Sequence, residues 1–170
     1  MRKLILAFFI ALGLGACSEQ EPDLYTGQQL EFDLFKSSDF DSNGTLTVKE
    51  LRDGKLEFDI QLEGAKSSTA YDFPAHLHFG GYDQADAPIA FLLNPVSSKD
   101  LESHTVLGSL SDGTSLDFEQ MKTFDGHVKI HLASEGPDYA VILVAGNLGS
   151  NTYGEVGFDA SRIAVCGKSF

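Results

Sequence analysis

Hydrophobic and polar residues alternate along most of the chain from residue 30 onward, and this period of two is the strongest constraint on the fold. The longest example is Leu56 to Leu62, where Leu, Phe, Ile and Leu alternate with Glu, Asp and Gln. The same alternation occurs at 30–34, 46–48, 75–79 and 128–132. Because successive side chains of a strand point to opposite faces, each segment is expected to be a strand with one buried face.

Two continuous apolar segments, 89–93 and 140–145, predict central strands. Turn-forming dipeptides separate the expected strands: Asp53-Gly54, Gly80-Gly81, Asp112-Gly113 and Asp125-Gly126. The one helical candidate is a turn or two within 115–124. Many short strands with regularly spaced turn signals predict an all-β protein, an antiparallel sandwich or barrel.

The N-terminus predicts export and lipidation. Arg2 and Lys3 precede a short apolar run, and Leu14-Gly-Ala-Cys17 resembles the lipobox of bacterial lipoproteins. We expect residues 1–16 to be removed as a signal peptide and Cys17 to be acylated, which would anchor the protein to a membrane outside the cytoplasm.

The remaining 154 residues are enough for one domain. We expect residues 17–29, which are acidic and polar, to be a tether and 30–170 to be the domain. Ser18 after the lipidated cysteine is compatible with sorting to a bacterial outer membrane.

Charge and cysteine content restrict the partners. Loss of Arg2 and Lys3 changes the formal net charge from −13 to −15, which argues against nucleic acid and anionic phospholipid as ligands. Membrane contact is therefore expected only through the lipid. With Cys17 acylated, Cys166 has no disulfide partner, and its apolar neighbours predict a buried, unreactive thiol.

Residues 39–50 match the letters of a calcium-binding EF-hand loop. The oxygen ligands would come from Asp39, Asp41, Asn43 and Glu50. The flanking residues alternate as strands rather than helices, and no second EF-hand is present. We therefore expect a β-hairpin with an acidic turn, with calcium binding as the less favoured alternative.

The histidines are the main candidates for chemistry. His76 and His78 alternate with Ala75, Leu77 and Phe79, which are expected to face the core. Residues i and i+2 of a strand lie about 7 Å apart on one face. Imidazoles at such positions can converge on one metal ion, about 2 Å from each ring nitrogen.

His127 and His131 form a second cluster. They share a face, but in a regular strand about 13 Å separates them, so at most one is expected to join His76 and His78. His104, the fifth histidine, is expected in a loop-to-strand region. Three imidazoles suit copper or zinc. The alternative is that the histidines are surface residues of strands, solvated or hydrogen-bonded.

Several short motifs resemble bacterial CHRD (chordin-like) lipoproteins. They are Pro74-Ala-His-Leu-His-Phe-Gly, Asp112-Gly-Thr, Phe124-Asp-Gly-His-Val-Lys-Ile-His-Leu and Ala145-Gly-Asn-Leu-Gly-Ser-Asn, and they span roughly 44–151. The resemblance implies that His76, His78 and His131 occupy the recurring positions, whereas His127 falls where relatives often have an aromatic residue. It implies a fold more than an activity.

A fainter resemblance is to Cu/Zn superoxide dismutase, a Greek-key β-sandwich. His76-Leu-His78 and Lys129-Ile-His131 are similar to its copper-binding segments, and Ser161-Arg-Ile-Ala-Val-Cys-Gly to its C-terminal motif. The resemblance implies that Arg162 guides an anion to copper and that His104 stands near a zinc position. The motif with the bridging histidine, the full zinc ligand set and the partner cysteine of Cys166 are absent from the sequence.

Together these observations predict a lipid-anchored, antiparallel Greek-key β-sandwich or barrel that binds copper or zinc through His76, His78 and His131, with His127 and His104 as further candidates. Its role would be metal capture or buffering in the cell envelope. The first alternative is a structural or adhesion module without a metal site. The second is an enzyme, a copper protein similar to superoxide dismutase. We expect a binding module rather than an enzyme.

Overall fold

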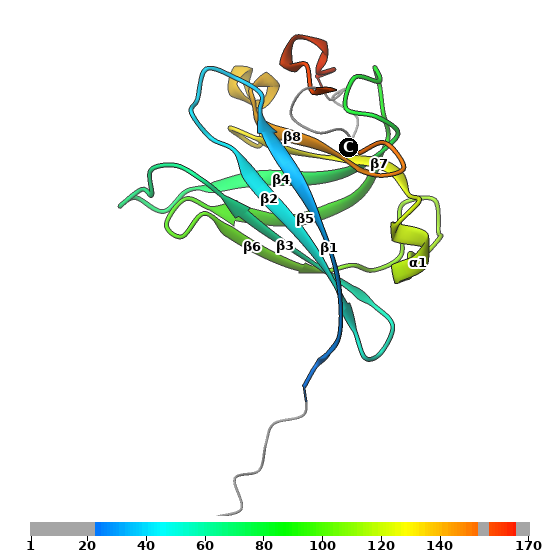
Figure 1. The fold of residues 1–170 in the computed structure, drawn as a ribbon. Coiled ribbons are helices and arrows are strands. Elements are labelled where there is room, and N and C mark those ends of the chain that lie inside the picture. Colours follow the sequence, from blue (N-terminus) through cyan, green and yellow to red (C-terminus); the bar gives the residue numbers. More distant parts are fainter. Residues whose placement is uncertain (1–22, 153–156, 166–170) are drawn as a thin grey trace, which may run out of the picture.

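The computed structural model describes residues 23–152 and 157–165, and its regular structure consists mainly of eight antiparallel strands (Figure 1). The strands are β1 (Tyr25–Lys36), β2 (Gly44–Leu51), β3 (Leu56–Leu62), β4 (Asp72–Phe79), β5 (Ile89–Ser97), β6 (Glu102–Val106), β7 (Asp125–His131) and β8 (Ile142–Gly149). The helical elements are α1 (Phe118–Met121) and the 3-10 turns η1 (Pro137–Ala140) and η3 (Ala160–Arg162). The all-β prediction is confirmed, and the short helix lies within the expected 115–124.

The strands form a nearly closed barrel in the order β5-β4-β7-β8-β1-β2-β3-β6. Strands β1, β2, β3 and β6 make one layer and β5, β4, β7 and β8 the other. The layers join where Phe35 and Lys36 of β1 pair with β8. Because the chain passes from β3 to β4 and from β6 to β7 between strands that are not neighbours, the connections are of the Greek-key type.

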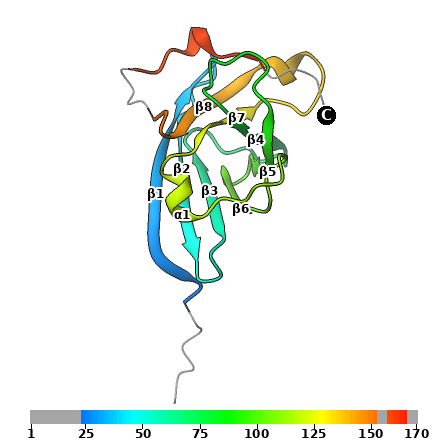
Figure 2. The same ribbon diagram turned by 90° about the vertical axis from the view of Figure 1, so that its right-hand side faces the viewer.

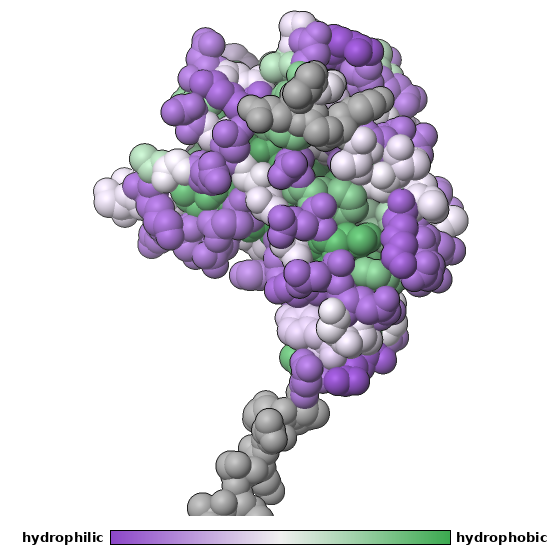
Figure 3. Space-filling model, viewed as in Figure 1, coloured by the Kyte–Doolittle hydropathy of each residue, from purple (hydrophilic) through white to green (hydrophobic). Residues whose placement is uncertain are grey.

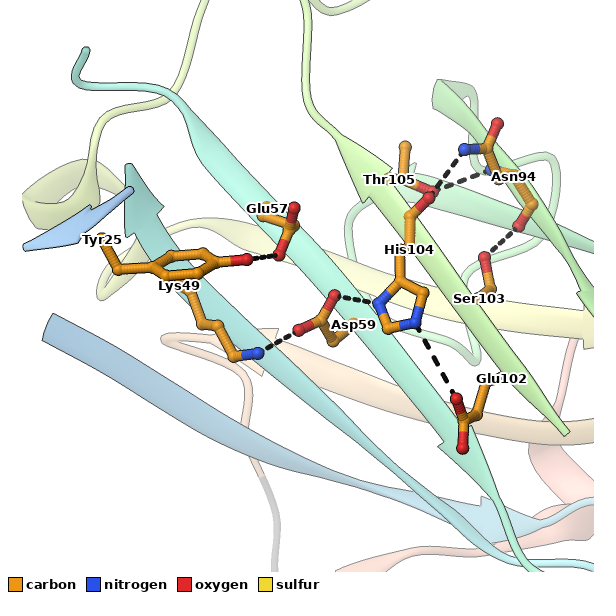
Figure 4. A network of polar contacts seen from close by, with 9 residues as sticks. All are labelled: Tyr25, Lys49, Glu57, Asp59, Asn94, Glu102, Ser103, His104 and Thr105. Atoms are coloured by element: carbon orange, nitrogen blue, oxygen red, sulfur yellow. Dashed lines mark hydrogen bonds and ion pairs between the residues drawn. The ribbon is translucent and has the colours of Figure 1, made fainter. Parts of the chain in front are cut away.

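Side chains close the barrel between β5 and β6, its two terminal strands. The backbone N–H of Asn94 donates to the Thr105 hydroxyl (2.9 Å), and the Asn94 side-chain amide donates to the His104 carbonyl (2.7 Å). The Ser103 hydroxyl donates to the Asn94 carbonyl (2.6 Å). These bonds, which Figure 4 shows, partly replace the backbone ladder that joins the other neighbouring strands.

The core lies inside the barrel and follows the alternation in the sequence. In β3, Leu56, Phe58, Ile60 and Leu62 are buried, while Gln61 is exposed. Helix α1 closes one end of the barrel with two buried residues, Phe118 and Met121. The helix is short but well capped, because Asp117 and Gln120 form a reciprocal capping box. On the face shown in Figure 3, hydrophilic residues surround the hydrophobic ones that reach the surface.

Three boundaries differ from the prediction. Strand β1 begins at Tyr25, inside the range expected to be a tether, and β8 runs from Ile142 to Gly149 rather than over 140–145. The prediction of a turn at Asp125-Gly126 was wrong, because both residues belong to β7. Gly126 is needed there for close packing, since a Cβ would lie 2.6 Å from the His78 carbonyl oxygen and would also contact the Phe124 ring.

None of the helices in the described part of the chain has the length and apolar character required to cross a bilayer.

Segment 157–165 lies over the outer faces of β7 and β8, at the opposite end of the molecule from the start of β1 (Figures 1 and 2). The Ala164 N–H donates to the Tyr82 carbonyl, and the Asp159 N–H donates to the Tyr82 hydroxyl. Phe158 and Ile163 pack against a small outer cluster of Tyr82, Ile142 and Ala145. The sheet is therefore covered on both faces at this position.

Candidate functional site on the outer face of β4 and β7

Strands β4 and β7 bring four histidines and one lysine together. His76 pairs with Lys129 and His78 with His127 across the antiparallel ladder. The neighbouring residues in each strand, such as Leu77 and Val128, are buried in the core. Alternation therefore places His76, His78, His127, Lys129 and His131 on the opposite, outer face, which we call the histidine face.

The histidine face is buried although it lies outside the barrel. His76 is 5% exposed, and His78, His127, Lys129 and His131 are each 1% exposed or less. The covering elements are the loop after β4, turn η1 and segment 157–165, whose backbone carbonyls accept hydrogen bonds from these side chains. These four histidines are therefore not solvated, and His78, His127 and His131 are hydrogen-bonded, which is the other form of the alternative stated from the sequence.

The imidazole rings form a continuous row. The ring centroids of His76 and His131 are 4.9 Å apart, and those of His76 and His78 are 5.9 Å apart, with interplanar angles of 50° and 65°. Two imidazoles on one tetrahedral metal ion, each bound at about 2 Å, have centroids about 5 Å apart. The spacing of His76 to both neighbours is therefore close to that of shared ligands.

His127 extends the row in a different way. Its ring stacks on that of His78 at 4.7 Å with an interplanar angle of only 6°. Parallel stacked rings direct their nitrogens side by side rather than toward a common point. At the other end of the row, His131 stacks on Tyr139 at 4.5 Å. His127 and Tyr139 thus support the rings on which they stack.

Backbone carbonyls fix the orientation of three of the rings. Nδ1 of His78 lies 3.0 Å from the Ala87 carbonyl oxygen, and Nδ1 of His127 lies 2.7 Å from that of Gly80. Nδ1 of His131 lies 2.7 Å from the Tyr139 carbonyl oxygen. A carbonyl only accepts, so a neutral ring must carry its proton on Nδ1 and its lone pair on Nε2. This tautomer, held by a carbonyl, is the usual arrangement of a metal-binding histidine.

Burial keeps the four imidazoles neutral. It lowers the pKa of His76 to about 3 and that of His78 to about 4. Burial, together with the charge of Lys129, lowers the pKa of His127 to about 3. The pKa of His131 is lowered for the same two reasons. Neutral imidazole is the form that binds metal ions.

Lys129 places a positive charge in the middle of this row. Its Nζ donates to the Ala164 carbonyl at 2.6 Å and so connects the sheet to segment 157–165. The same charge lowers the pKa of His78, His127 and His131, and it would also repel a bound cation. Lys129 is the functional residue that sequence reasoning missed, although its position between His127 and His131 in an alternating strand placed it on their face.

The second histidine cluster was expected to add at most one ring to His76 and His78, but both of its rings contact histidines of β4. His127 and His131 contact different histidines of β4, His78 and His76 respectively. Both therefore join the histidine face without lying side by side. Tyr139 also completes this face, and no local sequence signal indicates it, since it comes from a 3-10 turn that folds back over β7.

His104 lies apart from the other four histidines, within strand β6 rather than at a loop. Its Nδ1 is 2.6 Å from Asp59, whose carboxylate also pairs with Lys49 (Figure 4). Burial alone would raise the pKa of Asp59, but the hydrogen bonds from Lys49 and His104 lower it. The pKa of His104 is raised by its hydrogen bond to Asp59. His104 is thus an ion-pairing residue, and the structure does not bring it to the histidine face.

Arg162 lies in η3, within the segment that covers the histidine face. Its guanidinium forms an ion pair with Asp83. The neighbouring carboxylate offsets the positive charge that guidance of an anion would use.

Residues 39–50, which match the EF-hand pattern, form the turn and second strand of the expected β1–β2 hairpin. Asp41 pairs with Lys36, and the Asn43 side chain accepts from the Lys36 N–H. Glu50 lies near the other end of β2, where it accepts hydrogen bonds from Thr26 and Gln28. Glu50 is seven positions after Asn43 along extended chain, a distance of about 23 Å. Asp39 stays in the turn, so the four oxygen ligands do not surround one point.

Cys17 and Cys166 lie outside the described residues. Within the described ranges, no group of three or more histidine, cysteine, aspartate or glutamate side chains is already arranged as a metal centre. Metal binding on the histidine face therefore requires the rings of His76 and its neighbours to turn toward one another.

In comparisons with protein-family models, curated proteins and solved structures, the chain matches none.

Proposed function

We propose that this protein is a lipid-anchored envelope β-barrel that binds one copper or zinc ion through His76, His78 and His131. The observation that supports it most is the row of buried imidazoles, with His76 at 4.9 Å and 5.9 Å from its two neighbours. Carbonyl bonds at Nδ1 of His78 and His131 leave the lone pair of each neutral ring on Nε2, the nitrogen that would bind the metal.

The proposed role is capture or buffering of the metal in the cell envelope. Three neutral nitrogen ligands suit Cu or Zn, and reversible binding alone is enough for this role. The anchor at Cys17 and the bacterial outer-membrane location belong to the same proposal. Calcium binding at the β1–β2 turn is not part of it, because Glu50 is far from Asp41.

The presence of Lys129 on the histidine face favours a second candidate function, a purely structural one. In this alternative the histidine face is a structural network, in which three rings, those of His78, His127 and His131, bind backbone carbonyls of covering segments and Lys129 holds segment 157–165. The positive charge of Lys129 opposes a metal cation and favours this structural role. A superoxide dismutase-like enzyme has less support, because Arg162 is paired with Asp83.

Metal titration separates the two proposals. The protein without its lipid, residues 18–170, contains every strand of the barrel and would be titrated with Zn(II) and Cu(II) by calorimetry. The test variant is His76→Ala/His78→Ala, and the matched control is His104→Ala, which removes an imidazole from the other layer. One-to-one binding with a Kd below about 1 μM, lost in the double variant and kept in the control, supports the metal site. Weak binding that is equal in all three proteins would refute it and favour the structural role.

A further inference from the structure

The two ends of the barrel differ. Helix α1 and the segment before it fill one end with core residues, among them Leu110, Phe118 and Met121. At the other end, a cavity of about 360 Å³ opens between the β1–β2 turn, the segment after β3 and the ends of β7 and β8. The apolar side chains that line it are Phe40, Leu62, Phe73, Leu101, Leu132 and Leu143. Its size is within the range of small-molecule sites, and barrel mouths are common positions for such sites.

Two residues of this cavity indicate a site rather than a packing defect. Phe40 keeps half of its surface exposed at the rim, where an aromatic ring is available to cover an apolar ligand. Leu101 is buried with φ +66°, a left-handed conformation that is strained for leucine. Hydrogen bonds to the Ser97 carbonyl and from the Leu62 N–H hold Leu101 in the cavity wall.

Acidic side chains lie beside the apolar cavity. A second hollow of about 260 Å³ is lined by polar residues that include Asp33, Asn43 and Glu63. Glu63 lines both hollows. Lys36, three residues after Asp33, pairs with Asp41. Lys66, three residues after Glu63, is not within ion-pair distance of that glutamate. Among the described residues, Asp33 and Glu63 have no cationic partner within ion-pair distance.

We propose that the open end of the barrel binds a small amphipathic cation, an apolar chain or ring that carries a protonated or quaternary amine. The apolar part would occupy the cavity between Phe73 and Leu143, where it is removed from water. The amine would lie against Glu63 at the border of the polar hollow, where the carboxylate stabilises a positive charge. This site is separate from the histidine face and does not depend on metal binding.

The chain contains no tryptophan, so Phe40→Trp supplies a single fluorescent reporter at the rim. The probe is decyltrimethylammonium below its micellar concentration, with decanoate as the ligand of opposite charge. We expect a saturable emission shift with the cation and at least tenfold weaker binding of decanoate. Calorimetry on the unsubstituted residues 18–170 repeats the measurement without the reporter, so the result does not depend on how Phe40→Trp folds.

The role of Glu63 is tested by Glu63→Gln. This variant should lower the affinity for decyltrimethylammonium about three- to fivefold, which is the effect expected from losing a partly exposed ion pair. Glu31→Gln removes the same charge from β1 away from both hollows and should leave the affinity unchanged. The proposal is overturned if the signal does not saturate, if decanoate binds as well as the cation, or if the two glutamate variants behave alike.

Discussion

Lys129 lies directly opposite His76 in the β4–β7 ladder, and its amine donates to the Ala164 carbonyl at 2.6 Å. One side chain thus places a positive charge among four neutral imidazoles and holds the segment that covers them. A metal ion that binds the histidine face would therefore meet both the like charge of Lys129 and the segment that covers the imidazoles.

Lys129→Met keeps the apolar length of the side chain and removes its charge. If the imidazoles bind metal, affinity for Zn(II) should rise at least fivefold, because the repulsion between Lys129 and the cation is lost. Lys49→Met, which removes a lysine paired with Asp59 in the other layer, is the control and should change the affinity little. A lower affinity in Lys129→Met, measured by calorimetry, would show that the lysine positions the site rather than opposing it.

The five histidines should titrate in two distinct ways. The buried His76, His78 and His127 have pKa values lowered to about 3 to 4 and should stay neutral at pH 5. His131, with its lowered pKa, should titrate below an ordinary imidazole, and His104, with its raised pKa, above it. Long-range ¹H–¹⁵N spectra of the imidazole nitrogens report each ring. Metal affinity should accordingly persist below the pH 6.5 expected from an ordinary imidazole. Protonation of the buried rings near pH 6.5 would contradict the burial on which the site depends.

The same pKa values predict a pH-dependent stability. Below about pH 6.5 the unfolded chain binds protons at His76, His78 and His127 while the folded protein does not, so stability is complete above that pH and falls as the pH decreases toward the folded pKa values of about 3 to 4. The lowered pKa of His131 acts in the same direction. Each such histidine contributes a slope of about 1.4 kcal/mol per pH unit. Urea unfolding between pH 7 and 5 measures it.

A single variant checks that slope. His127→Gln should reduce the pH dependence of the unfolding free energy by about one proton, since one buried imidazole is removed. His104→Gln is the matched comparison with the opposite sign, because its pKa is raised and its stabilisation is lost as the pH rises. An unchanged slope in His127→Gln would mean that this ring is protonated in the folded state.

Gly126→Ala should destabilise the barrel. The added methyl group would lie 2.6 Å from the His78 carbonyl oxygen and against Phe124, so β4 and β7 would have to separate. Overpacking of this kind typically costs about 1–3 kcal/mol. Gly108→Ala is the control, because its Cβ would meet only the Phe91 ring at 3.4 Å. Chemical denaturation of both variants gives the difference, and equal stabilities would refute the close-packing role of Gly126.

Much of the fold was predictable because alternation is a local signal. Leu56 to Leu62 identified β3 and its buried face, and His76 and His78 were placed on the face opposite Leu77. The hairpin predicted for Asp39 to Glu50 was also correct, since hydrophobic and polar residues alternate on both sides of this segment and so argue against helices.

The burial and partners of the histidines were not predictable, because they depend on contacts far apart in the chain. His78 stacks on His127 only because β4 pairs with β7, and this pairing is set by the whole barrel. The carbonyls of Gly80, Ala87 and Tyr139 come from loops whose paths no local pattern defines. Gly126 was mistaken for a turn residue because the sequence does not show the second strand that approaches it.

The length of β1 sets how far the covered histidines stand from the proposed anchor. The strand has twelve residues and spans about 40 Å. It begins at the tethered end, and segment 157–165 lies at the opposite end. With a lipid on Cys17, the histidines would therefore lie toward the end of the barrel remote from the start of β1, buried beneath segment 157–165.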